Sequence, residues 1–165
     1  MLESLVNFRI VLKLVRKEKK LTQKLVAERC GLSINYVGRI ERGISTPTFL
    51  VFVSLCNGLE VKMSDFAQKM NNLSYVNNSY KFMDIRFLSS KLKKSRFFMC
   101  NFLLKNRKVK GLTQINLAKK AKVNKTYYGF IERGDVNPTL DKIFNIINAL
   151  NAKFYELLFY IENNW

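Results

Sequence analysis

The sequence predicts an all-α protein made of two copies of one small helical domain. Residues 21–66 align without a gap with residues 112–157, with about 15 identities in about 46 positions and a constant offset of 91 residues. Apolar residues recur at helical spacing in both copies. The chain has only two prolines, Pro47 and Pro138, and they occupy matched positions. A gapless internal repeat of this length predicts a tandem pair of similar domains.

The repeat also sets the expected domain boundaries. We expect a first domain at residues 1–70, a linker at 71–91 and a second domain at 92–165. The segment Asn71–Tyr80 is rich in Asn and Ser, which is typical of a linker. Lys81–Ser95 carries several apolar side chains and suggests a helix that packs between the two copies. The linker is therefore expected to be partly helical.

Five helices are predicted in the first copy from apolar spacing, capping residues and glycine stops. Thr22, Ser33 and Thr48 are good N-caps, and Gly31 and Gly43 follow helix ends. The expected helices are Leu5–Lys19, a second that starts after Thr22 and ends at Gly31, Ile34–Arg42, Phe49–Asn57 and Ser64–Met70.

The second copy repeats this plan from about Arg96, with Asn124 and Gly134 in place of the first copy's cap and stop. Its last helix, Phe154–Trp165, is longer and more apolar than the first copy's. An apolar stripe of this size predicts a packing partner, which is either the first repeat or another chain. The stripe favours some self-association.

The formal net charge of +17 points to a polyanionic partner. Nucleic acid is the first candidate and an anionic membrane surface the second. No apolar run is long enough to span a bilayer, and the start of the chain does not resemble a signal peptide. Histidine is absent and the three cysteines have no CxxC spacing, so no metal or cofactor is expected. Cys30 and Cys56 align with apolar residues and are expected to be core residues in a reducing cytoplasm.

One ordered set of residues occurs in both copies. It consists of Thr-Gln, an alanine in the middle of the following helix, Ile-Glu-Arg-Gly and Pro-Thr. This set resembles the lambda-repressor-like helix-turn-helix superfamily, the XRE family of bacterial and phage regulators, over about 60 residues of each half. The resemblance implies two tandem five-helix domains arranged as a pseudo-dimer. The segment from Thr126 to Leu140 looks especially like the controller proteins of restriction–modification systems, which are small homodimeric regulators.

The resemblance implies a division of roles around each second helix of the motif, because that helix enters the major groove of DNA. The positions that face bases map to Ile34, Asn35 and Arg39 in the first copy and to Lys125, Thr126 and Phe130 in the second. The phosphate contacts map to Gln23, Tyr36, Arg42, Gln114, Tyr127 and Arg133. The alternative for the two tyrosines is a core position with the hydroxyl at the surface, and for the two glutamines an exposed polar position beside the helix cap. For each base-facing residue it is an ordinary solvated or half-buried face. Since the copies differ at every base-facing position, they should read different half-sites, or one copy reads little sequence.

The resemblance further implies two structural ion pairs, Arg16 with Glu41 and Arg107 with Glu132. Each would hold the recognition helix against the first helix of its copy. Gly38 and Gly129 lie inside the recognition helices, where glycine costs about 1 kcal/mol relative to alanine. Their presence suggests a close approach of the backbone to DNA or to another helix, or simple descent from a duplicated ancestor.

The expected function is a cytoplasmic, sequence-specific transcription regulator whose partner is a double-stranded DNA operator. The alternative is an antitoxin-type protein that holds a second protein through its apolar C-terminal helix and binds DNA to regulate itself. An enzyme is not expected, because the acidic residues are scattered and no histidine is available. Membrane binding is not expected either, because the apolar faces are accounted for as core.

Overall fold

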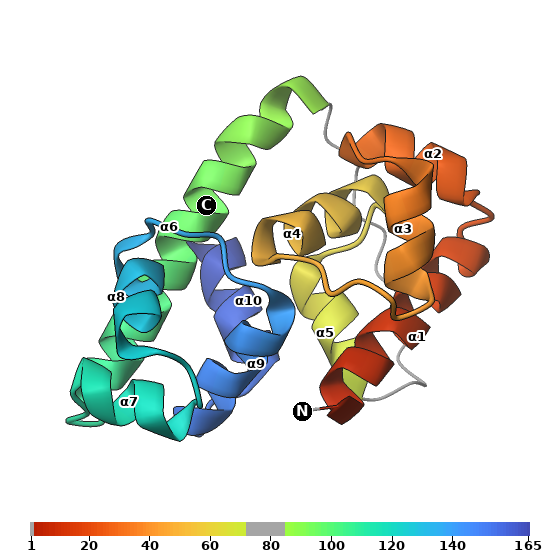
Figure 1. Cartoon of the computed structure of the whole chain (residues 1–165). Helices are drawn as coiled ribbons and strands as arrows, with labels where there is room; N and C mark the ends of the chain where they lie inside the picture. Colours follow the sequence, from red (N-terminus) through yellow and green to blue (C-terminus); the bar gives the residue numbers. More distant parts are fainter. Residues whose placement is uncertain (1, 72–84) are drawn as a thin grey trace.

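The computed structural model describes residues 2–71 and 85–165, and the side chains of 4–71 and 89–165, and these residues form ten helices (Figure 1). The predicted all-α fold is confirmed. The helices are α1 (Leu2–Glu18), α2 (Gln23–Cys30), α3 (Ile34–Glu41), α4 (Phe49–Gly58), α5 (Met63–Asn71), α6 (Ile85–Val109), α7 (Gln114–Lys120), α8 (Lys125–Arg133), α9 (Leu140–Ala149) and α10 (Phe154–Asn163). Among the described helices none is long and apolar enough to cross a membrane.

Local capping chemistry fixes the helices of the motif where the sequence predicts them. The side-chain oxygen of Thr22 accepts a hydrogen bond from the Leu25 amide at 3.1 Å, and that of Ser33 accepts one from the Tyr36 amide at 3.2 Å. These bonds satisfy amides that a helix start leaves without partners. Gly31 then ends α2 in the left-handed region, with φ 65°. The turn between α2 and α3 is therefore specified by its own residues.

Several expected helix ends shift by one to three residues, and one expected element is rearranged. The helix α5 begins at Met63, one residue before the predicted start, and α6 is a single 25-residue helix from Ile85 to Val109. The sequence suggested a separate helix at Lys81–Ser95 before the second copy. The structure instead joins the later part of that segment to the first helix of the second copy. The remainder of the expected linker, residues 72–84, lies outside the described residues.

The two copies are related by an approximate twofold rotation. The amide of Phe49 donates to the Pro138 carbonyl at 2.8 Å, and the amide of Leu140 donates to the Pro47 carbonyl at 2.9 Å. Both residues of the second copy are 91 positions after their first-copy equivalents, so the two bonds are the same bond made in each direction. Thr48 and Thr139 form the resulting antiparallel bridge. Reciprocal contacts of this kind are what a twofold interface requires.

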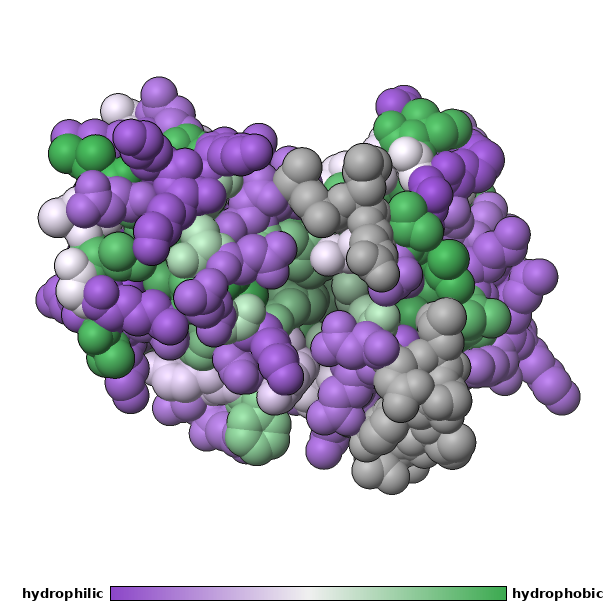
Figure 2. All heavy atoms as spheres, turned by 90° about the horizontal axis from the view of Figure 1, so that it is seen from below, coloured by the Kyte–Doolittle hydropathy of each residue, from purple (hydrophilic) through white to green (hydrophobic). Residues whose placement is uncertain are grey.

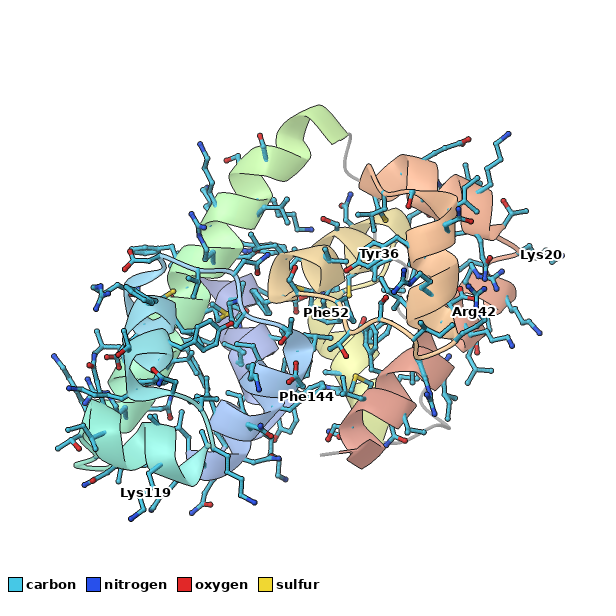
Figure 3. The ribbon with its side chains drawn as sticks, in the orientation of Figure 1. Lys20, Tyr36, Arg42, Phe52, Lys119 and Phe144 are labelled. Carbon is cyan, nitrogen blue, oxygen red and sulfur yellow. The ribbon has the colours of Figure 1, made fainter. Side chains whose placement is uncertain are left out.

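Figure 1 looks approximately along this axis, so α2 and α3 on one side face α7 and α8 on the other. The helices α4, α5, α9 and α10 fill the centre. In Figure 3, Phe52 and Phe144 lie in this central region, whereas Lys20 and Arg42 lie at one end of the molecule and Lys119 at the other. The central helices thus form the contact between the copies, and these three basic side chains lie toward the two ends of the molecule.

The apolar stripe of the last helix packs within the chain. Leu157, Leu158 and Ile161 are fully buried, and α10 lies against α5 of the first copy and α6 of its own. The aromatic ring of Phe52 from the first copy lies 5.6 Å from that of Phe154. The first repeat is therefore a packing partner of this helix. Phe159 remains 60% exposed.

Candidate nucleic-acid interface

The helix α3 presents a polar and basic face to solvent and buries the opposite face. Ile34, Asn35, Arg39 and Arg42 are exposed, whereas Val37 is fully buried in the core of the first copy. All three residues predicted to face bases in this copy are therefore accessible. Their positions along the first two turns are those that reach base edges when such a helix enters a major groove.

The helix α8 has the same division. Lys125, Thr126, Phe130 and Arg133 are exposed, and the ring of Tyr128 is fully buried. The three residues predicted to face bases in the second copy are thus also accessible. Neither recognition helix is packed inside the protein.

The matched tyrosines Tyr36 and Tyr127 are half-buried and pack against the core. Burial raises the pKa of Tyr127, and the nearby carboxylate of Asp141 raises it further. Both rings therefore contribute to the core. Their role as phosphate contacts stays a prediction.

A buried ion pair ties α3 to α1 in the first copy. Arg16 Nε donates to Glu41 Oε1 at 2.6 Å and Arg16 Nη2 donates to Glu41 Oε2 at 3.0 Å. Arg16 Nη1 donates to the Leu21 carbonyl at 2.9 Å, and Gln23 Nε2 donates to Glu41 Oε2 at 2.8 Å. Burial acts to raise the pKa of Glu41, but the hydrogen bonds from Arg16 and Gln23 outweigh it and lower that pKa. The cluster therefore stabilises the carboxylate and joins α1, α2 and α3.

The second copy repeats the cluster with one addition. Arg107 Nε donates to Glu132 Oε1 at 2.7 Å, Arg107 Nη1 donates to the Leu112 carbonyl at 2.7 Å, and Gln114 donates to Glu132 Oε2. The Tyr128 hydroxyl also donates to Glu132 Oε1 at 3.2 Å. Burial and the adjacent carboxylate raise the pKa of Tyr128, so this hydroxyl stays protonated. The first copy has Val37 at the equivalent position and lacks this bond.

The amides of Gln23 and Gln114, which are predicted to contact phosphates, are each bound within their own copy. Each donates one hydrogen bond to the glutamate of its copy, a contact between residues 18 positions apart that helical periodicity does not reveal. Each amide group retains a second hydrogen. The predicted phosphate role therefore depends on that remaining hydrogen and on the amides at the start of α2 or α7.

The two glycines of the recognition helices make room for these side chains. A Cβ atom at Gly38 would lie 3.0 Å from Arg42 Nη1 and 3.4 Å from Gln23 Oε1. At Gly129 the corresponding distances, to Arg133 and Gln114, are 3.4 Å and 3.7 Å. The close approach at these glycines is thus made by the predicted phosphate-contacting residues of the same copy.

The exposed cations of the two copies have different neighbours. Arg39 Nε donates to Ser45 Oγ at 3.1 Å. In the second copy, Arg133 Nε donates to Asp135 Oδ2 at 2.9 Å, and its guanidinium lies 5.1 Å from the Phe130 ring. The first copy has Ile44 in place of Asp135, so no carboxylate follows Arg42 at that spacing. The sequence analysis did not predict the contacts of Ser45 and Asp135. Both residues lie close in the sequence to the arginines that they contact, and this short separation could have indicated the contacts.

Figure 2 views the molecule from below and shows two lobes at its upper edge with a hollow between them. Hydrophilic side chains cover most of the left lobe, and the right lobe carries both hydrophilic and hydrophobic side chains. The upper edge of this view corresponds to the face toward the viewer in Figure 1, where α3 and α8 lie on either side of the twofold axis. The two recognition helices are therefore carried on separate lobes of one face.

Comparison with known families gives two matches to the same family model, described as helix-turn-helix, at residues 12–66 and 103–157. The two matches are offset by 91 residues at both ends and together cover two thirds of the chain. The chain belongs to the helix-turn-helix family. No curated protein and no solved structure matches it.

This helix-turn-helix protein carries two XRE-type domains in tandem and is a DNA-binding transcription regulator of that type. Its family is one of DNA-binding domains rather than of enzymes. Within the described part of the chain, no group of His, Cys, Asp and Glu side chains is arranged to hold a metal ion.

Proposed function

We propose that the chain is a sequence-specific transcription regulator that binds one operator containing two unlike half-sites. The observation that carries this proposal is the reciprocal bridge at Thr48 and Thr139, which relates the two domains as the subunits of a dimer are related. One chain then supplies the two recognition helices that two identical chains supply in a homodimer. Its recognition helices would enter successive major grooves about 34 Å apart.

The base-facing residues support half-sites of different sequence. In the first copy, Arg39 suits guanine, whose O6 and N7 accept two hydrogen bonds, and Asn35 suits adenine. In the second copy, Lys125 and Thr126 replace Ile34 and Asn35, and Phe130 suits the methyl group of thymine. An operator read by this chain therefore has no need to be palindromic.

The closing experiment is a footprint on DNA upstream of the chain's own gene, followed by affinity measurements on that site. One chain per operator should protect about two half-sites, one helical turn apart. The Arg39→Ala variant should weaken binding to the operator by about 1–3 kcal/mol and leave binding to unrelated DNA nearly unchanged. An equal loss on both DNAs would show that Arg39 contacts only the backbone.

We further propose that the chain is the controller of a restriction–modification system. It is supported by the resemblance of the segment from Thr126 to Leu140 to such controllers. A footprint on the promoter of an adjacent methyltransferase or endonuclease gene would support it. A footprint confined to unrelated promoters would contradict it and leave the two-half-site proposal intact.

The antitoxin alternative predicts a partner protein bound to the apolar C-terminal helix. The stripe that suggested it is largely occupied within the chain, because Leu157, Leu158 and Ile161 pack against α5 and α6. A stoichiometric protein that copurifies through Phe159 or Trp165 would favour it. Self-association through Phe154–Trp165 also stays a prediction, which sedimentation of the purified chain tests.

A further inference from the structure

The contact between α5 and α10 crosses the twofold axis, and its two sides are built differently. The helices run antiparallel, so the start of α5 meets the end of α10 on one side, and the end of α5 meets the start of α10 on the other. With the 91-residue offset, Ser64 corresponds to Tyr155, and Asn71 corresponds to Glu162. In a symmetric dimer the two sides would be identical. In this chain the matched residues differ, so the two sides of the contact can be compared with one another.

One side, here called the closed side, is bridged by the carboxylate of Glu162, although Ser64, Glu162 and Trp165 also line a smaller hollow of about 300 Å³ there. Its Oε1 accepts from the Met63 amide at 2.7 Å, and its Oε2 accepts from the Ser64 hydroxyl at 2.5 Å. A carboxylate from the second copy thus caps a helix of the first, where the partial positive charge of the helix start favours it. Lys91 of α6 lies beside this contact, with Nζ 4.2 Å from the Trp165 ring.

Lys91 belongs to the N-terminal part of α6, and its contact with Trp165 places it on this closed side. Residues 85–91 of α6 have no equivalent in the first copy, because subtracting 91 leaves no position in the chain. The helix α6 lies against both α4 and α10, so it contacts both copies. Lys91 is itself buried, with 7% of its surface exposed.

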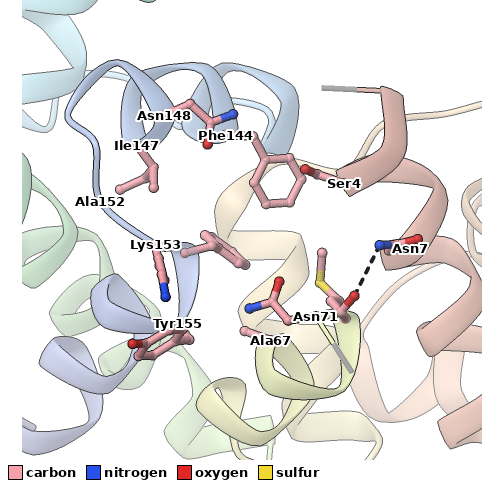
Figure 4. A pocket seen from close by; sticks show the side chains of 12 residues that line it. Ser4, Asn7, Ala67, Asn71, Phe144, Ile147, Asn148, Ala152, Lys153 and Tyr155 are labelled. Carbon is pink, nitrogen blue, oxygen red and sulfur yellow. Dashed lines mark hydrogen bonds between the residues drawn. The ribbon is translucent and has the colours of Figure 1, made fainter. Parts of the chain in front are cut away.

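The other side, here called the hollow side, lacks the bridging carboxylate and has the larger of the two hollows. Asn71 stands where the first side has Glu162, and a cavity of about 500 Å³ opens between α1, α5, α9 and α10 (Figure 4). Ala67 and Asn71 line it from the first copy, and Lys153 and Tyr155 from the second. The hydrogen bond drawn there, from Asn7 Nδ2 to the Met70 carbonyl at 3.1 Å, joins two helices of the first copy.

We propose that Glu162 is a positioning residue that fixes the angle between the two recognition helices and thereby the operator spacing that the chain accepts. This inference rests on the proposed binding of two half-sites. The bridge at Thr48 and Thr139 lies on the axis, and a contact on an axis holds the copies together without fixing rotation about it. The Glu162 contact lies off the axis and has no counterpart on the other side, so it adds a directional restraint on that rotation to the packing between the helices of the two copies.

The experiment measures the affinity of the full chain for operators whose half-site spacing is increased or decreased by one or two base pairs. The operator is a duplex selected from a random pool with the wild-type chain. Wild type should prefer one spacing sharply. The Glu162→Gln variant should lose about tenfold of this discrimination, because a hydrogen-bonded charge is replaced by a neutral amide. The Glu28→Gln variant, which removes the same charge from an exposed site on α2, should keep it.

The outcomes separate this inference from the proposed function. A purely structural role for Glu162 would weaken binding to every spacing equally and would overturn the inference, as would an unchanged spacing preference. Wild-type binding that ignores spacing would instead overturn the two-half-site proposal. If Glu162→Gln does not fold, Ser64→Ala removes only the hydroxyl bond and is expected to shift the same preference in the same direction. An unchanged preference in that variant would overturn the inference.

Discussion

At the scale of the residue, positions 91 apart act as internal controls for one another. Gly31 has φ 65°, and its equivalent Lys122 has φ 53°. Gly111 has φ 62°, and its equivalent Lys20 has φ 54°. Both copies therefore keep the left-handed turn geometry whether or not glycine is present. The fold of the repeat therefore imposes a positive φ on these two lysines, although residues other than glycine rarely adopt it.

This pairing predicts unequal effects of alanine in the two turns. The Gly31→Ala variant should lower the free energy of unfolding by about 1 kcal/mol, because a Cβ atom in the left-handed region is strained. The Lys122→Ala variant should change it by less than about 0.5 kcal/mol, because that strain is already present. Urea denaturation of the two variants measures the difference. Equal losses would show that the two turns are not equivalent.

The buried carboxylates predict an acid-sensitive contribution to stability. The hydrogen bonds from Arg16 and Gln23 outweigh burial and place the pKa of Glu41 below its ordinary value of 4.5. A lowered pKa in the folded state means that its stabilisation is present above the unfolded pKa and is lost as the pH falls through the folded pKa. The Glu41→Gln variant should therefore be about 2 kcal/mol less stable than wild type at neutral pH. This gap should narrow below about pH 4.5.

The same measurement has a matched control in Glu28→Gln, which changes an exposed carboxylate on α2. Its stability should follow that of wild type across the pH range. A gap between Glu41→Gln and wild type that stays constant down to pH 3 would show that the loss comes from packing rather than from the ionised carboxylate.

At the scale of the element, the sequence predicts a helix well when the residues that start and stop it are its own. Ser33 and Gly31 are adjacent to the helices that they delimit, so the motif could be placed to within a residue. The start of α5 was also placed to within a residue, but the cap that holds it was not predicted, because it is Glu162, a residue 99 positions away from Met63. The continuity of α6 was missed for a similar reason, since it depends on packing against α4 of the other copy.

Some features of the candidate interface could likewise be predicted from the sequence, and others could not. The exposure of Asn35, Arg39 and Lys125 follows from helical spacing, which sets their face apart from the buried one. The bond from Gln23 to Glu41 joins two helices whose relative placement spacing alone does not give. Asp135, which fixes Arg133, could have been found from sequence because the two residues are neighbours in the chain.

The hollow side of the contact between α5 and α10 predicts a stabilising substitution. The Asn71→Glu variant places a carboxylate opposite the start of α10, where Glu162 stands on the closed side. It should raise the free energy of unfolding by about 1 kcal/mol through the charge at a helix start. The Asn71→Gln variant keeps the length without the charge and should give no gain. Equal effects of the two variants in thermal denaturation would contradict the electrostatic explanation.

At the scale of the whole molecule, the two copies share one aromatic core. The ring of Phe52 lies 5.5 Å from Phe66 within the first copy and 5.6 Å from Phe154 of the second. Phe154 in turn lies 4.8 Å from Phe144. Because the rings are in continuous contact, loss of one domain exposes the core of the other. The recognition helices are therefore held by a single packed unit rather than by two independent domains.

The charge of this unit predicts a steep dependence of DNA binding on salt. With a net charge of +17, operator affinity should fall by about a thousandfold or more between 50 and 200 mM salt, as counterions are released from neutralised phosphates. The Arg42→Gln variant should reduce the slope of log affinity against log salt by about 1. Arg133→Gln should reduce it less, because Asp135 lies beside the arginine and repels the same phosphate. Equal changes in slope would mean that Asp135 leaves Arg133 on binding, and a flat response in wild type would contradict phosphate binding by this basic surface.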